Sequence, residues 1–301
     1  MNYFSFEIEP TKCRQLSVRF RVVFGKRGAR LEPVLAERPL GMPVGDALLF
    51  KPEVDVFIEG NVHPRTEGAR ESTLRLHGAG LDVSARVFGS RAIVKGASGV
   101  RIGEPARIEP FELDAREAYG AAAYPRNPLG QGYVTDESDA VGTPLPRIED
   151  PADLLTNDRL VASPARWWEQ PVPALFEPRL ASAFPRGVVL GLLNMPAPAP
   201  RDADSDFAQE APRQLRLARL EPGMALTVEG CLPSGRAWTW AMPAEPAMRL
   251  SVEGRAIDTP AVAQTIRLRP DADEAVVTFA FEHTMHRAFV PGLHARITIE
   301  V

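Results

Sequence analysis

Proline is the feature that most restricts how this chain can fold. The sequence has 29 prolines among 301 residues, about twice the usual share. A proline inside a helix removes a hydrogen bond and clashes with the preceding turn, at a cost of about 3 kcal/mol. Few windows of twelve residues lack both proline and glycine. A mainly helical protein is therefore excluded, and short strands joined by turns are favoured.

Two parts of the chain show the two-residue period of half-buried antiparallel strands. In residues 1–118 the alternation covers segments 16–22, 54–59 and 81–87, and His77–Gly80 fits a hairpin turn before the last of these. In residues 214–301 it covers segments 226–228, 238–242, 250–252, 266–268, 277–281 and 295–301. We expect an all-β protein whose antiparallel sheets have one wet face and form a sandwich-like arrangement.

Residues 119–213 lack this period and form a proline-rich central excursion. They hold fourteen of the 29 prolines, and the stretch from Asp136 to Glu177 has nine acidic residues against three arginines. Eight aromatic residues also lie here, whereas disordered segments are poor in aromatics. We expect an ordered, largely irregular excursion with short helical turns, ending in a solvated loop at 197–204. The two β regions and the excursion are expected to form one integrated domain.

Charge and hydropathy exclude several partners. The net charge is −4, which argues against nucleic acid. The first residues lack the basic and apolar regions of a secretory signal, and the longest apolar run, 188–195, is too short to span a membrane. We expect a cytoplasmic protein without a membrane partner. We therefore expect Cys13 and Cys231 to be reduced thiols, with one long-range disulfide between them as the alternative. Cys231 is expected to be a small buried residue.

Catalytic motifs are not evident in the sequence. His283 and His286 would lie on opposite faces of a strand, and His283 continues an apolar face, so we expect it in the core. His63 and His77 could come together across a hairpin with Asp55 as a third metal ligand. These three residues lack the short spacing that is diagnostic of a metal site. There is no Gly-x-Ser-x-Gly elbow, and no carboxylate pair stands out. We therefore predict no catalytic residue, no metal and no cofactor.

Three motifs in order carry a family resemblance. Phe50–Gly60, followed by His63-Pro64, is similar to a Lys-Pro-x-x-Asp pattern that ends in glycine; Asn127–Tyr133 is similar to Asn-Pro-x-Gly-x-Gly-aromatic; and Leu145–Pro151 is similar to Leu-Pro-x-Ile-Glu-x-Pro. With Arg86–Arg91 between the first two, the chain resembles the bacterial domain-of-unknown-function family that is encoded beside type VI secretion effectors and PAAR-tip proteins. The motif residues, which we expect to be structural, are Lys51, Pro52, Asp55, Gly60, Asn127, Pro128, Gly130, Gly132, Glu149 and Pro151.

The resemblance implies a non-catalytic adaptor or chaperone that holds a secreted effector and helps to load it onto the spike or PAAR tip. The excursion is where we expect the partner to bind, with Trp167, Trp168, Phe176 and Tyr133 as candidate contacts. The two tryptophans would otherwise pin the excursion to the sheet. The alternatives are a carbohydrate-active enzyme and a carbohydrate-binding module, in which Trp167 and Trp168 would form a stacking platform.

Two further expectations concern side chains within the β regions. Lys51 and Asp55 have the same strand parity, so they are expected to pair with each other or with the Asn-Pro turn. Trp238 and Trp240 share the face of Met242 and are expected in the core.

Overall fold

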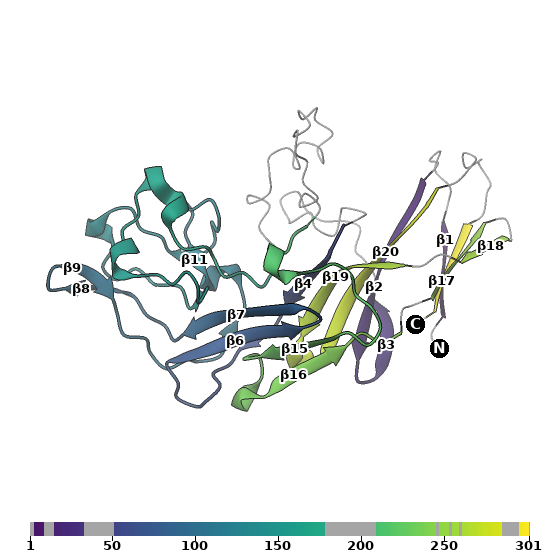
Figure 1. Ribbon diagram of the computed structural model, residues 1–301, viewed down its shortest axis with the longest axis horizontal. Helices are drawn as coiled ribbons and strands as arrows, with labels where there is room; N and C mark the ends of the chain where they lie inside the picture. The colour runs from purple at the N-terminus through teal and green to yellow at the C-terminus, as the bar shows by residue number, and fades with distance from the viewer. Residues whose placement is uncertain are drawn as a thin grey trace.

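A computed structural model describes residues 3–8, 15–32, 51–177, 209–244, 247–252, 255–258, 261–284 and 295–300. These residues form several mainly antiparallel sheets, so the predicted β-rich class is confirmed (Figure 1). The largest sheet contains, in spatial order, β14 (Arg216–Leu217), β4 (Val54–Ile58), β19 (Val262–Arg269), β20 (Glu274–Thr284), β2 (Gln15–Gly25) and β3 (Gly28–Glu32).

A second sheet faces it, and four smaller groups of strands complete the structure. The second sheet contains β13 (Ile148–Glu149), β7 (Leu81–Phe88), β6 (Glu71–Gly78), β15 (Ala225–Glu229) and β16 (Ala237–Ala241). A four-stranded sheet joins β1 (Tyr3–Ile8), β21 (Ala295–Glu300), β17 (Ala247–Val252) and β18 (Arg255–Asp258). The two-stranded pairs are β5 (Asn61–Val62) with β10 (Phe111–Glu112), β8 (Ile93–Gly96) with β9 (Gly99–Ile102), and parallel β11 (Tyr119–Gly120) with β12 (Gln131–Gly132).

One hydrophobic core lies between the six-stranded and the five-stranded sheet. It joins residues from both ends of the sequence, such as Val22 and Leu76 with Val228 and Phe279. Fully burying a side chain of this size contributes about 1.5–3 kcal/mol. The alternating segments therefore face one shared core. Trp238 and Met242 are buried in it and Trp240 packs against it, as expected.

The hairpin turn predicted at His77–Gly80 joins β6 and β7 and has two residues. Gly78 pairs with Leu81, and the turn residues Ala79 and Gly80 both have positive φ, at 50° and 90°. Two positive φ values are what a type I′ turn requires, and this turn matches the right-handed twist of the strands.

Strand β4 differs from its prediction. The alternation over 54–59 predicts one wet face, but all five residues of β4 are buried, and β4 pairs in parallel with β19 while β14 covers its other edge. The polar residue Asp55 tolerates this burial because Lys51 neutralises it. The guanidinium of Arg267 lies 5.3 Å from the ring centroid of Phe57. Strand β4 therefore has both faces covered although its sequence alternates like that of a half-exposed strand.

Residues 119–177 of the excursion have a hydrophobic core of their own. This core contains Tyr119, Tyr124 and Leu160, and Ile93 of β8 packs into it. Short 3-10 helices occur as predicted: η2 (Ala115–Glu117) just before the excursion, then η3 (Glu137–Asp139), η4 (Asn157–Arg159) and η5 (Pro164–Glu169). Figure 1 shows residues 119–177 at the end of the molecule opposite β1 and β17. The loop expected at 197–204 lies outside the described residues.

The remaining 3-10 helices connect strands of the sandwich. They are η8 (Arg213–Leu215), η9 (Pro233–Gly235) and η10 (Pro270–Ala272). Proline occupies the first position of η9 and η10, where its missing N–H costs no hydrogen bond. Several prolines of this chain therefore start short helical turns.

Candidate functional site

The first motif builds a buried ion cluster. The Nζ atom of Lys51 lies 2.6 Å from Oδ2 of Asp55, 2.9 Å from Oγ1 of Thr265 and 3.3 Å from Oε2 of Glu210. The side chains of Lys51 and Asp55 are 1% and 0% exposed. The backbone N–H groups of Glu210 and Ala211 donate to the Asp55 carboxylate. The predicted pairing of Lys51 with Asp55 is confirmed, and it fastens residues 210 and 211 to β4.

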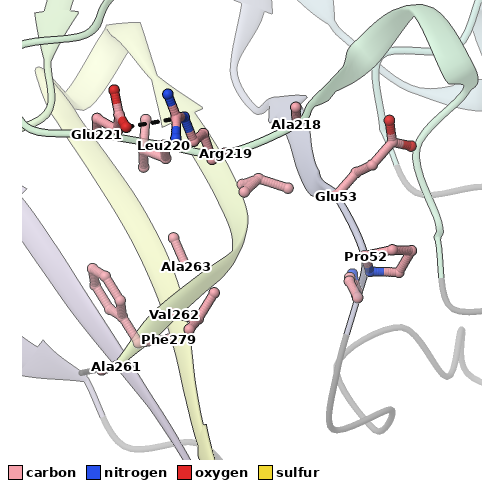
Figure 2. Close-up of a pocket in the computed structure, with 12 residues that line it drawn as sticks. Pro52, Glu53, Ala218, Arg219, Leu220, Glu221, Ala261, Val262, Ala263 and Phe279 are labelled. Carbon is pink, nitrogen blue, oxygen red and sulfur yellow. Dashed lines mark ion pairs between the residues drawn. The ribbon is translucent and has the colours of Figure 1, made fainter. Parts of the chain in front are cut away.

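Pro52 follows the cluster and lies just before β4. The ladder between β4 and β14 ends at Leu217 opposite Val54. A pocket of about 230 Å³ opens beside this point, and Figure 2 shows Phe279, Ala263 and Val262 on one wall and Pro52 and Glu53 on the other.

The chemistry of this pocket offers little to a ligand. Arg219 and Glu221 on its rim pair with each other at 2.9 Å, and Lys51 directs its ammonium to Asp55. Its volume is also below the range of about 300–1,000 Å³ that is usual for small-molecule sites. The pocket therefore presents apolar walls without convergent free polar groups among the residues described.

The second motif closes a tight loop at the start of the excursion. The Nδ2 group of Asn127, which is fully buried, donates to the carbonyl oxygens of Ala115 at 2.7 Å and Tyr119 at 3.2 Å. A Cβ on Gly130 would lie 2.4 Å from Asn127 Nδ2, so only glycine fits. Gly132 has a φ of 99°, whereas Gly130 does not have positive φ. Close packing rather than backbone conformation therefore requires Gly130.

The remaining prolines and glycine of the motifs lie in turns. Pro128 is half-buried in the Asn127 loop, and Pro151 is exposed in the turn after β13. Gly60, between β4 and β5, has a φ of 140°, and Asp271 lies against it while accepting from the backbone N–H of Asn61. Each shapes the backbone and leaves no reactive group.

The third motif supplies a buried carboxylate that holds the excursion against the second sheet. Glu149 accepts from the guanidinium of Arg91 and from the backbone N–H of Leu155 at 2.8 Å. Burial raises the pKa of Glu149 and lowers that of Arg91. Arg91 also lies over the ring of Phe88, 3.7 Å from its centroid. Both groups are committed to each other, which fits the expected structural role.

A stack of aromatic rings forms the centre of the excursion. The rings of Tyr119, Tyr124 and Tyr133 contact one another, Trp167 meets Tyr124 edge-on, and Trp168 meets Trp167 edge-on. The buried hydroxyl groups have partners: Tyr119 donates to Gln170 and Tyr124 to the carbonyl oxygen of Pro171. Burial raises the pKa of Tyr119 and Tyr124. The stack is therefore rigid, and Trp168 stands at its outer end.

The four residues predicted to contact a partner have different environments. Phe176 and Tyr133 are 3% and 8% exposed and belong to the two cores, so neither side chain presents a surface to a partner in this structure. Trp167 is half-buried and packs against the excursion core. Trp168 is 55% exposed. The excursion thus uses one tryptophan for packing and presents the other.

The orientation of the two tryptophans excludes the predicted carbohydrate platform. A stacking platform needs exposed, coplanar rings, whereas the planes of Trp167 and Trp168 meet at 78° and Trp167 is half-buried. Arg126 also lies 5.4 Å from the centroid of the Trp167 ring. The two rings therefore share no flat surface on which a sugar could stack.

Exposed large apolar side chains gather on the excursion. Of the five in the described part of the chain, four lie between residues 129 and 172: Leu129, Val141, Trp168 and Val172. The fifth, Val262, borders the pocket. Sequence reasoning missed Leu129, Val141 and Val172, because an aperiodic segment has no pattern that distinguishes exposed from buried positions.

The residues considered for catalysis do not form a site. Asp55 pairs with Lys51, and Nε2 of His77 lies 3.1 Å from Oε1 of Glu229 rather than beside Asp55. Among the described residues no group of three or more His, Cys, Asp or Glu side chains is arranged to hold a metal. Burial raises the pKa of the Cys231 thiol to about 12. The side chains at His283, His286, His294 and Cys13 lie outside the described part.

Glu177 is a partly buried carboxylate at the end of the described part of the excursion. Burial raises its pKa to about 7, opposed by the backbone N–H of Ala115, which donates to Oε1 at 2.6 Å. The nearby charges of Asp114 and Glu112 also raise it. Its carboxylate joins the end of the excursion core to the start of η2.

Comparison with known proteins places the chain in a family. The model of a family described as "Uncharacterized protein conserved in bacteria (DUF2169)" matches residues 28–280. The chain belongs to this family. The matched range contains all three motifs, so the predicted membership of a bacterial family of unknown function is confirmed. No curated protein and no solved structure matches the chain.

The structure also bears on the membrane question. In the residues that it describes, no helix has the length and apolar character needed to cross a bilayer.

Proposed function

We propose that this protein is a non-catalytic adaptor that binds a type VI secretion effector and assists its loading onto the spike or PAAR tip. The observation that carries the proposal is the exposed ring of Trp168 on a rigid aromatic stack. Tryptophan is enriched among the residues that dominate binding energy at protein interfaces. The adaptor would act in the cytoplasm, before export, and needs no cofactor.

The stack supports binding because it is already ordered before a partner arrives. Trp168 rests on Trp167, which rests on Tyr124, whose hydroxyl is fixed by the carbonyl oxygen of Pro171. An anchor held in this way loses little conformational entropy on binding. Val172 adds a second exposed apolar side chain two residues after the stack-capping Gln170. Together they supply the centre of an interface.

Charge on the excursion favours a basic segment in the partner. Asp136, Glu137, Asp139 and Asp158 are exposed and have no ion-pair partner within the described residues. The arginines of this stretch are already used: Arg147 pairs with Glu117, Arg159 with Asp153 and Arg166 with Glu169. An acidic surface speeds encounter with a basic partner and disfavours acidic ones.

The test is co-purification with the products of neighbouring effector genes, followed by affinity measurement. The adaptor should elute with one of them at fixed stoichiometry. Trp168→Ala should weaken that complex by about 30-fold or more, the usual effect of losing a central anchor. Val262→Ala removes an exposed apolar group elsewhere and should leave affinity unchanged.

The two parts of the proposal fail separately. If no neighbouring effector binds, the adaptor function is refuted. If an effector binds wild type and Trp168→Ala equally, the adaptor function stands and the excursion is not its docking surface. Unchanged thermal unfolding of Trp168→Ala is the control, because an exposed ring contributes little to the core.

A further inference from the structure

The outer edge of β16 lacks the features that normally protect a sheet edge. Natural edge strands carry charged residues, proline or bulges that prevent pairing with another chain. Among the described edge strands and hairpins of three or more residues, β1 has Glu7, β3 has Arg30 and Glu32, β18 has Arg255 and Asp258, and the β8–β9 hairpin has Lys95 and Arg101. Strand β16 reads Ala-Trp-Thr-Trp-Ala, without charge, proline or glycine.

The backbone of β16 is paired on one side only. It pairs with β15 from Ala237 to Ala241, and in the described part of the chain no backbone hydrogen bond reaches it from the opposite side. Figure 1 shows β16 along the outer margin of the five-stranded sheet, away from the excursion. An edge of this kind presents free N–H and C=O groups in a row.

Packing of its two tryptophans against the core fixes the position of β16. Trp238 is buried and its indole N–H donates to Asp273, while Trp240 packs against Phe24 with ring centroids 6.1 Å apart. The outward residues Ala237, Thr239 and Ala241 are small and exposed. A second strand can therefore approach without displacing side chains.

The sequence of β16 identifies the occupant. Ala237-Trp238-Thr239-Trp240-Ala241 reads the same in both directions. When such a strand pairs antiparallel with its own copy around Thr239, each residue meets its own kind, which is the self-complementarity that a two-fold interface requires. A threonine pair is favourable across strands, and the molecule already uses one: the hydroxyls of Thr227 and Thr239 lie 2.9 Å apart.

We propose that β16 pairs antiparallel with β16 of a second copy, which joins the two five-stranded sheets across a two-fold axis at Thr239. This inference is independent of the adaptor function, because β16 and the excursion are separate elements. A single strand pair buries a small area, so the dimer should be of the weak, concentration-dependent class.

Sedimentation or light scattering across a concentration series tests the pairing. Wild type should approach twice its 32.9 kDa mass at about 100 µM, a range suited to a small interface. Thr239→Lys places two ammonium groups opposite each other and should weaken self-association by about tenfold or more. Thr239→Glu should do the same, and a mixture of the two variants should dimerise again. Thr135→Lys, at an exposed threonine outside β16, should behave as wild type.

Three results would overturn the proposal. The first is a wild type that stays monomeric over the whole concentration range, the second is a Thr239→Lys variant that dimerises as wild type does, and the third is a mixture of the Lys and Glu variants that does not associate. If wild type is monomeric and captures the effector but Thr239→Lys does not, a strand of the effector occupies the edge of β16 instead of a second copy. Unchanged thermal unfolding confirms that each variant is folded.

Discussion

Replacing Lys51 by methionine should destabilise the protein strongly, because it removes the only cation that contacts both buried carboxylates among the described residues. The Nζ atom lies 2.6 Å from Asp55 and 3.3 Å from Glu210, whose side chains are almost fully buried. Methionine fills a similar volume but leaves both carboxylates without their ammonium. Breaking a buried ion pair from one side typically costs about 3–5 kcal/mol, a fifth or more of the usual stability of about 5–15 kcal/mol.

Lys26→Met is the matched control. Lys26 also pairs with a carboxylate, Asp273, at 2.8 Å, but its side chain is 82% exposed. Exposed pairs contribute about 0–1 kcal/mol. The two variants therefore make the same substitution and differ mainly in the burial of the pair.

Urea unfolding monitored by tryptophan fluorescence measures both costs. We expect the midpoint of Lys51→Met to fall well below that of Lys26→Met, with similar slopes. Glu210→Gln keeps a side chain of the same shape and removes one of the two negative charges, so it should cost less than Lys51→Met and serves if that variant does not fold. A Lys51→Met cost within about 1 kcal/mol of the control would refute the reasoning.

Three other predictions concern the excursion and the buried thiol. Gly130→Ala places a methyl group 2.4 Å from Asn127 Nδ2. In thermal unfolding this variant should lose more stability than Gly142→Ala, where the space is open and only the positive φ costs about 1 kcal/mol. Burial raises the pKa of Glu177 from 4.5 to about 7, so the carboxyl stabilises the fold at low pH and this contribution is lost as pH rises from about 4.5 to 7; the unfolding free energy should fall over that range, and Glu177→Gln should reduce the fall. In a Cys13→Ser background, Cys231 should resist a thiol reagent until the protein unfolds; rapid labelling of the native state would contradict its burial.

Local physics explains why the strands were predictable. Successive side chains of a strand point to opposite faces, so alternation reveals which residues share a face. This was sufficient for β7 and β16 and for placing Trp238 in the core. The pairing of Lys51 with Asp55 followed from their equal parity, and the turn at Ala79 from its glycine neighbours.

Alternation does not show what covers the second face of a strand. The pattern of β4 predicted a wet face, but β14 and β19, which follow it by more than 150 residues, enclose it in the sheet. The same long-range packing brings Glu210 and Thr265 to Lys51. Neither residue carries a spacing signal, because the contact depends on chain closure rather than on neighbouring positions.

The sequence by itself determined that this chain forms β sheets with an ordered, aromatic and acidic excursion. Only the tertiary structure decided which aromatic residues face outward. Tyr133, Phe176 and Trp168 look alike in an aperiodic segment, yet two of them fill cores and one remains exposed. The reason is physical: in an irregular segment no repeating geometry links sequence position to direction, so packing against distant residues sets the exposure of each side chain.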